Sequence, residues 1–132
     1  MKPTRSTAYL KYIRSHCSCL WWERPSEPLV FEDAETQAHH IRMGSNEGLG
    51  QKPSDFRCVP LTAMEHRKLH NQGEKSFWLS TGIDPYEVMT WLLYGWLIKR
   101  GYKDLEVPRE GAGQFSYERI VAVAEAEHRS MV

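Results

Sequence analysis

Four of the chain's six histidines lie in two short stretches, and their spacing constrains the fold more than any other feature. His66 and His70 stand four residues apart, which places both rings on one face of a helix. His39 and His40 are adjacent, and on a strand their rings point to opposite faces. A strand beside that helix therefore brings three imidazoles together and leaves the fourth next to them.

Three imidazoles can hold one divalent metal ion, and a free imidazole can take a proton from water near neutral pH. We therefore predict a centre for metal-assisted hydrolysis in which His66 and His70 are joined by one histidine of the adjacent pair. A zinc protease does not fit, because its helix carries a glutamate directly after the first histidine. This chain has Arg67 at that position.

The segments around these histidines resemble the HNH, or ββα-metal, endonucleases. The resemblance covers roughly residues 10–78 and is specific as a combination, whereas two histidines four residues apart are not specific alone. Three segments carry it: residues 37–42 (QAHHIR), residues 48–55 (GLGQKPSD) and residues 59–70, where Val-Pro-Leu precedes Glu-His and a second His. The second segment resembles a loop of phage-borne members, including a recombination-associated branch.

The resemblance implies a role for each histidine. His39, His66 and His70 bind one divalent ion, for which we expect Zn, Ni, Mn or Mg, and His40 is the general base that activates water. The alternative is that the roles of His39 and His40 are exchanged. Hydrolysis of DNA by this family implies products with 5′-phosphate and 3′-hydroxyl ends.

At the residue that orients the general base, this chain departs from the family pattern. The family's usual asparagine position falls near Arg57, which cannot orient His40 in the same way. We expect Asp55 to replace it as a second catalytic residue, and the alternative is that Asp55 is an ordinary turn residue. Asn46 and Asn71 are placed less well for this role.

The formal net charge is zero, which is unusual for a protein that binds nucleic acid. Basic residues nevertheless flank the predicted site, and we expect phosphate contacts from Arg42, Lys52, Arg57 and Lys68. DNA is the expected partner, with recombination proteins as further partners. The alternative is a non-catalytic, metal-stabilised module that binds nucleic acid or protein on the same scaffold.

The predicted fold class is α+β: a ββα-metal (HNH) hairpin-helix core flanked by an N-terminal helix and two C-terminal helices. One domain of residues 1–132 holds an HNH-like region at 10–78 and a C-terminal helical extension at 84–130. Apolar periodicity and turn residues predict helices at 7–15, 61–72, 85–100 and 116–129. Strands are expected at 29–31 and 36–41, joined by a turn at Glu32 and Asp33, and residues 42–57 form a long loop.

Three cysteines, an odd number, argue against a disulfide framework. Separate reduced thiols are expected at Cys17, Cys19 and Cys58, because Thr62 and Glu65 stand where the resemblance implies two zinc ligands. The alternative is a partial zinc site that the three cysteines share with a histidine, residue 16.

Two further expectations concern location and assembly. No signal-peptide pattern begins the chain, and its longest apolar stretch, residues 89–98, is too short to cross a bilayer. We therefore expect a protein of the bacterial cytoplasm with no membrane partner. The helix at 85–100 is apolar nearly all round, and the final helix offers it only a thin apolar face. We expect a second copy to bury the surplus, which gives a homodimer.

Overall fold

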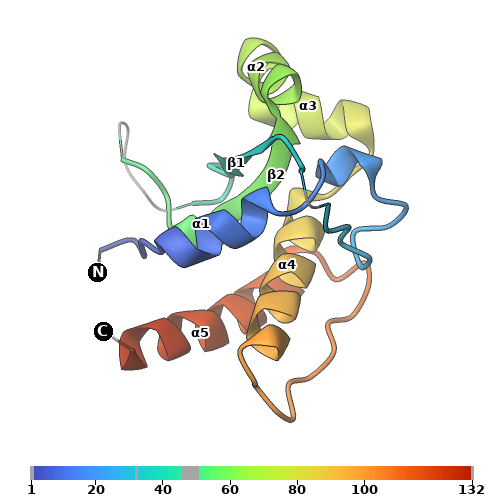
Figure 1. Cartoon of the computed structure of the whole chain (residues 1–132). Helices are drawn as coiled ribbons and strands as arrows, with labels where there is room; N and C mark the ends of the chain where they lie inside the picture. The colour runs from blue at the N-terminus through green and yellow to red at the C-terminus, as the bar shows by residue number, and fades with distance from the viewer. Residues whose placement is uncertain (1, 32, 46–50, 132) are drawn as a thin grey trace.

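In the described part of the chain, five α-helices and a two-stranded antiparallel sheet make up the fold, which confirms the α+β class (Figure 1). The computed structural model describes residues 2–31, 33–45 and 51–131. The elements in chain order are α1 (Thr7–Arg14), β1 (Thr36–His40), β2 (Cys58–Thr62), α2 (Ala63–Gln72), α3 (Glu74–Thr81), α4 (Pro85–Lys99) and α5 (Gln114–Ser130), with short 3-10 turns η1 (Cys19–Trp21) and η2 (Asp55–Arg57).

The two strands that pair in the sheet are not the two that the sequence predicted to pair. β1 confirms the strand expected at 36–41, but its partner is β2, in a register that pairs Thr36 with Thr62 and His40 with Cys58. The strand predicted at 29–31 is wrong, because Val30 makes only a single bridge to His16. The hairpin turn expected at Glu32 and Asp33 falls partly outside the described residues.

Burial explains why no strand was predicted at β2, whose last two residues were assigned to the following helix. Four of its five residues are buried, so it lacks the alternation of apolar and polar residues that marks a half-exposed strand. Pro60 lies in this strand, which a two-stranded sheet tolerates because each of its strands is an edge. The observed order is therefore strand, loop, strand, helix.

A capping box begins α2 directly after β2. The Thr62 side chain accepts a hydrogen bond from the Glu65 amide at 3.2 Å, and the Glu65 carboxylate accepts one from the Thr62 amide at 2.9 Å. The hydroxyl of Ser18, a buried residue beside η1, donates to the same carboxylate at 2.6 Å. The two positions where the resemblance implies zinc ligands thus form a helix cap tied to η1.

We expect Glu65→Ala to lower the free energy of unfolding by about 1–2 kcal/mol. The substitution removes half of the capping box and leaves the buried Ser18 hydroxyl without its acceptor. Urea denaturation measures the change, and Glu35→Ala, at an exposed position, is the control. Equal stability of the two variants would contradict the capping role.

One helix of the structure was missed. α2 ends at Gly73, whose φ of +96° favours glycine, and α3 begins at once with Glu74 and buries Phe77 and Trp78. Three helices therefore follow α2 where two were predicted. The last of them, α5, begins at Gln114, two residues before the start that the sequence predicted.

α4 confirms the predicted helix and is covered on more than one side. It begins at Pro85, the Asp84 side chain accepts from the Tyr86 amide at 2.9 Å, and it packs against α5, α1 and β2. Its buried apolar residues are Val88, Met89, Leu92, Leu93 and Leu97.

The apolar surplus of α4 is smaller than its sequence implied, because α1 covers a side that we had left to α5 alone. The Trp96 ring packs edge-to-face against Tyr9, with centroids 5.2 Å apart, and at a tilt against Tyr12, at 5.1 Å, whereas Ile98 stays 45% exposed. The homodimer remains a prediction, and less exposed apolar surface on α4 supports it than the sequence implied. Within the part of the chain described, no helix combines the length and apolar character that crossing a membrane requires.

Candidate metal centre

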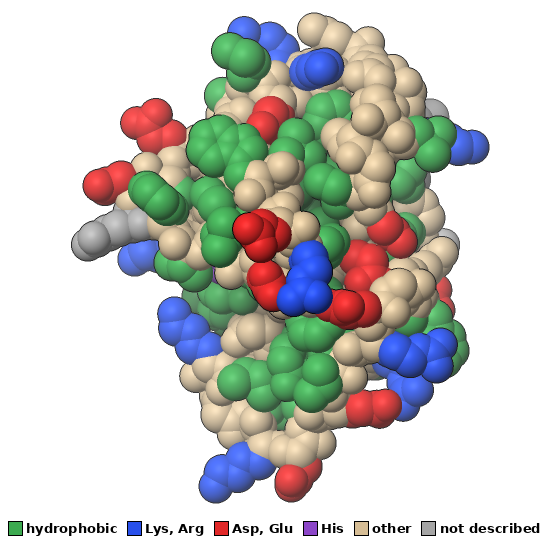
Figure 2. Space-filling model, turned by 90° about the vertical axis from the view of Figure 1, so that its right-hand side faces the viewer, with side chains coloured by type: hydrophobic (Ala, Val, Ile, Leu, Met, Phe, Trp, Pro, Cys, Tyr) green, Lys and Arg blue, Asp and Glu red, His purple; other side chains and the backbone are tan. Residues whose placement is uncertain are grey.

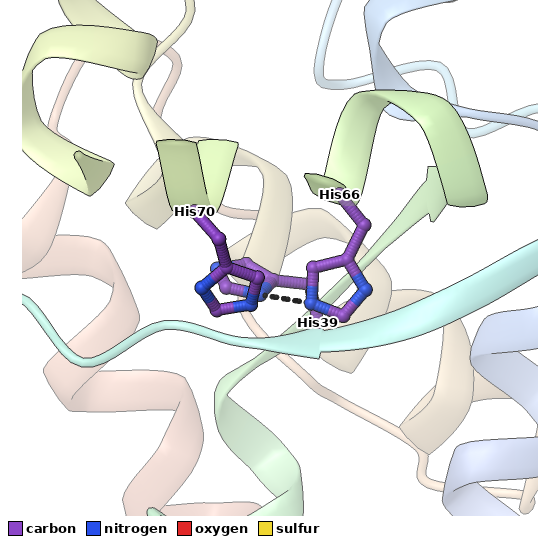
Figure 3. Close-up of side chains that lie close together, drawn as sticks. All are labelled: His39, His66 and His70. Carbon is purple, nitrogen blue, oxygen red and sulfur yellow. Dashed lines mark hydrogen bonds between the residues drawn. The ribbon is translucent and has the colours of Figure 1, made fainter. Parts of the chain in front are cut away.

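β1 and α2 bring His39, His66 and His70 together (Figure 3). One ring nitrogen from each residue lies within 4.8 Å of the others. The Nδ1 atom of His39 is 3.0 Å from Nε2 of His66, and the His70 ring centroid is 4.7 Å from that of His66. The spacing of four residues on α2 places two of the rings, and the strand presents the third to them.

The geometry of this cluster fits a metal ion. Two imidazole nitrogens bound to one ion lie about 3.0–3.4 Å apart, given metal–nitrogen bonds of about 2.1 Å. The His39–His66 separation of 3.0 Å falls at the lower end of that range. Among the described residues, these three are the one group of His, Cys, Asp and Glu close enough to share an ion.

The local environment disfavours a positive charge on His39 and His66. Burial, together with the neighbouring rings of His66 and His70, lowers the pKa of His39 to about 3. Burial and His70 also lower the pKa of His66. A neutral imidazole has the lone pair that a metal needs, so these two rings lose no proton when an ion binds at neutral pH.

His40 lies against Asp55, as one of our two interpretations of Asp55 required. The distance from His40 Nε2 to Asp55 Oδ1 is 2.8 Å, and both side chains are largely buried. Burial lowers the pKa of His40, and the hydrogen bond to the carboxylate partly raises it again. The other carboxylate oxygen accepts the Ser6 amide at 2.8 Å, and the guanidinium of Arg5 is 3.6 Å away.

α5 supports the turn that carries Asp55. η2 is capped by Ser54, whose side chain accepts from the Phe56 amide at 3.1 Å and donates to Glu125 of α5 at 3.2 Å. The Tyr117 hydroxyl, also on α5, donates to the Phe56 carbonyl at 3.1 Å. Asp55 is therefore held by contacts from both ends of the chain.

The histidines line a cleft of about 730 Å³ whose charge is mainly positive. Its charged lining residues are Arg14, Arg42, Lys52 and Glu74. Three cations against one carboxylate give the cleft a positive potential although the whole chain is neutral. Arg42 and Lys52 are thus placed where phosphate contacts were predicted, and Arg14 was missed.

Arg57 does not line this cleft, although we predicted a phosphate contact there. Its guanidinium donates to the Ile41 carbonyl at 3.0 Å and lies over the rings of Tyr86 and Tyr117 at 5.5 and 5.6 Å. These contacts tie the end of β1 to α4 and α5. Arg57 therefore stabilises the packing of these elements and does not face the cleft.

Lys68 also lies away from the cleft. It lines a shallow depression on another side of α2, together with Arg67 and Asn71. Asn71 is accordingly not in reach of His40. Asn46 and the Gly-Leu-Gly part of the loop that resembles the phage-borne family members lie outside the described residues.

Two residues around the histidines were not predicted as site residues. The Gln37 side-chain oxygen lies 2.8 Å from Nδ1 of His66, and the Glu74 carboxylate accepts the Arg42 amide at 3.1 and 3.2 Å. Gln37 precedes His39 by two positions and so shares its face of β1, a signal that could have revealed it.

The face of the molecule drawn in Figure 2 shows no histidine side chain. On that face, hydrophobic side chains gather around intermixed acidic and basic ones. Mixed charge does not favour a polyanion. The basic cleft with its histidines is therefore the better candidate for phosphate binding.

The cysteines are buried and unpaired. Among the described residues, Cys17, Cys19 and Cys58 do not form a group that can share an ion. Burial raises the pKa of the Cys19 and Cys58 thiols.

Because thiolates are the reactive form, we expect a disulfide reagent to modify the folded chain at least about a hundredfold more slowly than the unfolded chain. Absorbance of the released thiol measures the rate, and denaturant should expose all three cysteines. Fast modification of the folded chain would contradict the buried arrangement.

Comparisons with protein-family models, with curated proteins and with solved structures find no match. The resemblance to HNH endonucleases is therefore supported by no relative and remains a prediction. The residues of the cleft carry the functional argument.

Proposed function

We propose that this protein is a metal-dependent HNH-type endonuclease that hydrolyses phosphodiester bonds in DNA. The observation that carries the proposal is that three clustered histidines and His40, which is hydrogen-bonded to the buried Asp55, line one basic cleft. The order strand, loop, strand, helix, with the cluster between β1 and α2, supports a ββα-metal arrangement. Phosphodiester hydrolysis needs this combination of an ion site, a base and cationic walls.

Each residue of the cleft has a defined task in this mechanism. His39, His66 and His70 hold the ion, which supplies Lewis-acid stabilisation of the charge that develops on the phosphate and the leaving 3′ oxygen. His40 takes a proton from the attacking water at Nδ1, because its Nε2 is engaged by Asp55. Asp55 holds the ring in place and stabilises the imidazolium that forms.

The walls of the cleft position the substrate. Arg14, Arg42 and Lys52 are exposed there and neutralise phosphates on either side of the scissile bond. The products of this mechanism carry 5′-phosphate and 3′-hydroxyl ends. Three imidazoles suit zinc, nickel or manganese better than magnesium.

The proposal extends to the setting in which the protein works. We place it in the bacterial cytoplasm, in the processing of phage or prophage DNA, with recombination proteins as further partners. A homodimer would put two such clefts on one duplex, the arrangement required to cut both strands.

A non-catalytic, metal-stabilised binding module is the second candidate. The zero net charge favours it, because it weakens non-specific attraction to DNA. Two observations count against it: a structural site has no use for the His40–Asp55 pair, and structural zinc sites usually contain cysteine.

Plasmid cleavage separates the two candidates. Protein stripped with a chelator should leave supercoiled DNA intact, and adding back Zn²⁺, Ni²⁺, Mn²⁺ or Mg²⁺ separately should restore nicking or linearisation with at least one ion. Measured binding to the same DNA with no cleavage by any of the four ions would favour the binding module.

A further inference from the structure

The two ring nitrogens of His39 face different surroundings. Nδ1 points to the cluster, at 3.0 Å from Nε2 of His66. Nε2 is buried and has no hydrogen-bond partner among the described residues. The group that faces it is the Glu74 carboxylate, whose Oε1 atom is 3.9 Å away. When Nδ1 binds an ion, the proton of the neutral ring lies on Nε2, and a buried N–H without an acceptor is costly.

Glu74 is held where it can be that partner. It is the first residue of α3, and both of its oxygens accept the backbone amide of Arg42, which follows β1 by two residues. Its side chain is 14% exposed and lines the cleft. A small rotation of this carboxylate shortens the 3.9 Å separation to a hydrogen bond and keeps the bond to the strand.

Glu74 acts on His39 and not directly on the shared site. The group of mutually close ligand atoms contains the three histidines and not the Glu74 carboxylate. His66 shows the same arrangement in completed form, because the Gln37 side-chain oxygen lies 2.8 Å from its Nδ1 and leaves Nε2 for the cluster. Each of these two rings thus has a polar side chain near the nitrogen that faces away from the cluster.

We propose that Glu74 is a positioning residue of the metal centre: its carboxylate accepts the Nε2–H of His39, fixes that tautomer and presents Nδ1 to the ion. A histidine ligand whose second nitrogen donates to a carboxylate is oriented and made more basic by it. This role rests on the proposed metal centre: without an ion Nδ1 of His39 is hydrogen-bonded to Nε2 of His66, whereas an ion bound at Nδ1 leaves the His39 proton on Nε2.

Two measurements test this role. Long-range ¹H–¹⁵N NMR of the zinc-loaded protein should show His39 protonated at Nε2, and Glu74→Ala should convert it to a mixture of tautomers. Calorimetric titration with Zn²⁺ and Ni²⁺ should show about 10- to 100-fold weaker binding by Glu74→Ala. Glu74→Gln keeps an acceptor for both N–H groups, so it should restore the Nε2–H tautomer and much of the affinity.

Glu65→Ala is the matched control, because Glu65 also caps a helix but does not line the cleft. It should lose stability and keep the parent affinity for both ions. An unchanged His39 tautomer together with unchanged metal affinity in Glu74→Ala would overturn the assignment. If the parent protein binds neither ion, the proposed metal centre and the role of Glu74 both fall; if it binds them and Glu74→Ala changes neither readout, only the role of Glu74 falls.

Discussion

Replacement of His40 by alanine is expected to slow DNA cleavage by about a hundred- to ten-thousand-fold, the usual cost of losing a general base. The ring is the one imidazole of the cleft outside the cluster, and its bond to Asp55 holds it ready to accept a proton. Because His40 contributes no atom to the cluster, metal affinity should stay at the parent value.

Single-turnover cleavage of supercoiled plasmid measures the rate, and calorimetry measures metal binding in the same preparation. His128→Ala, on α5 and away from the cleft, is the control for loss of an imidazole. A His40→Ala protein that cuts at the parent rate would show that another group is the base. Loss of metal in this variant would show that His39 and His40 exchange roles.

Replacement of His70 by alanine is expected to weaken metal binding by at least about a hundredfold. This loss exceeds the one expected when a residue that only hydrogen-bonds to a ligand, such as Glu74, is removed. Two imidazoles remain, and cleavage should fall with the metal content. His70 is exposed in the last turn of α2, so the fold should tolerate the change.

Asn71→Ala is the control for His70→Ala, because Asn71 is the next residue of the same helix and faces away from the cleft. Parent-like metal affinity in His70→Ala would remove this residue from the site. Replacement of His39, His66 and His70 together should leave almost no bound zinc. A full equivalent of zinc in that triple variant would reveal a cysteine site.

Much of the helical structure could be predicted because helix ends depend on local sequence. Asp84 and Pro85 begin α4, and the helix stops within two residues of Gly101, as capping preferences require. The histidine cluster was also predictable, since it needs only helical spacing and one strand beside the helix.

The remaining features depend on tertiary contacts. β2 looks like an apolar run, and its pairing with β1 closes a connection of 17 residues, from 41 to 57, with no local signal. The role of Arg57 is set by Tyr86 and Tyr117, which lie 29 and 60 positions further along the chain. Glu74 is placed by a helix that was not predicted.

The support of η2 by α5 has a consequence for the order in which the protein matures. The three clustered histidines lie within residues 39–70, on β1 and α2. The turn that holds Asp55 waits for Tyr117 and Glu125, which follow His70 in the chain by 47 and 55 residues. A nascent chain can thus gather its metal ligands before its base is aligned, which delays cleavage until α5 has been made and has packed against the turn.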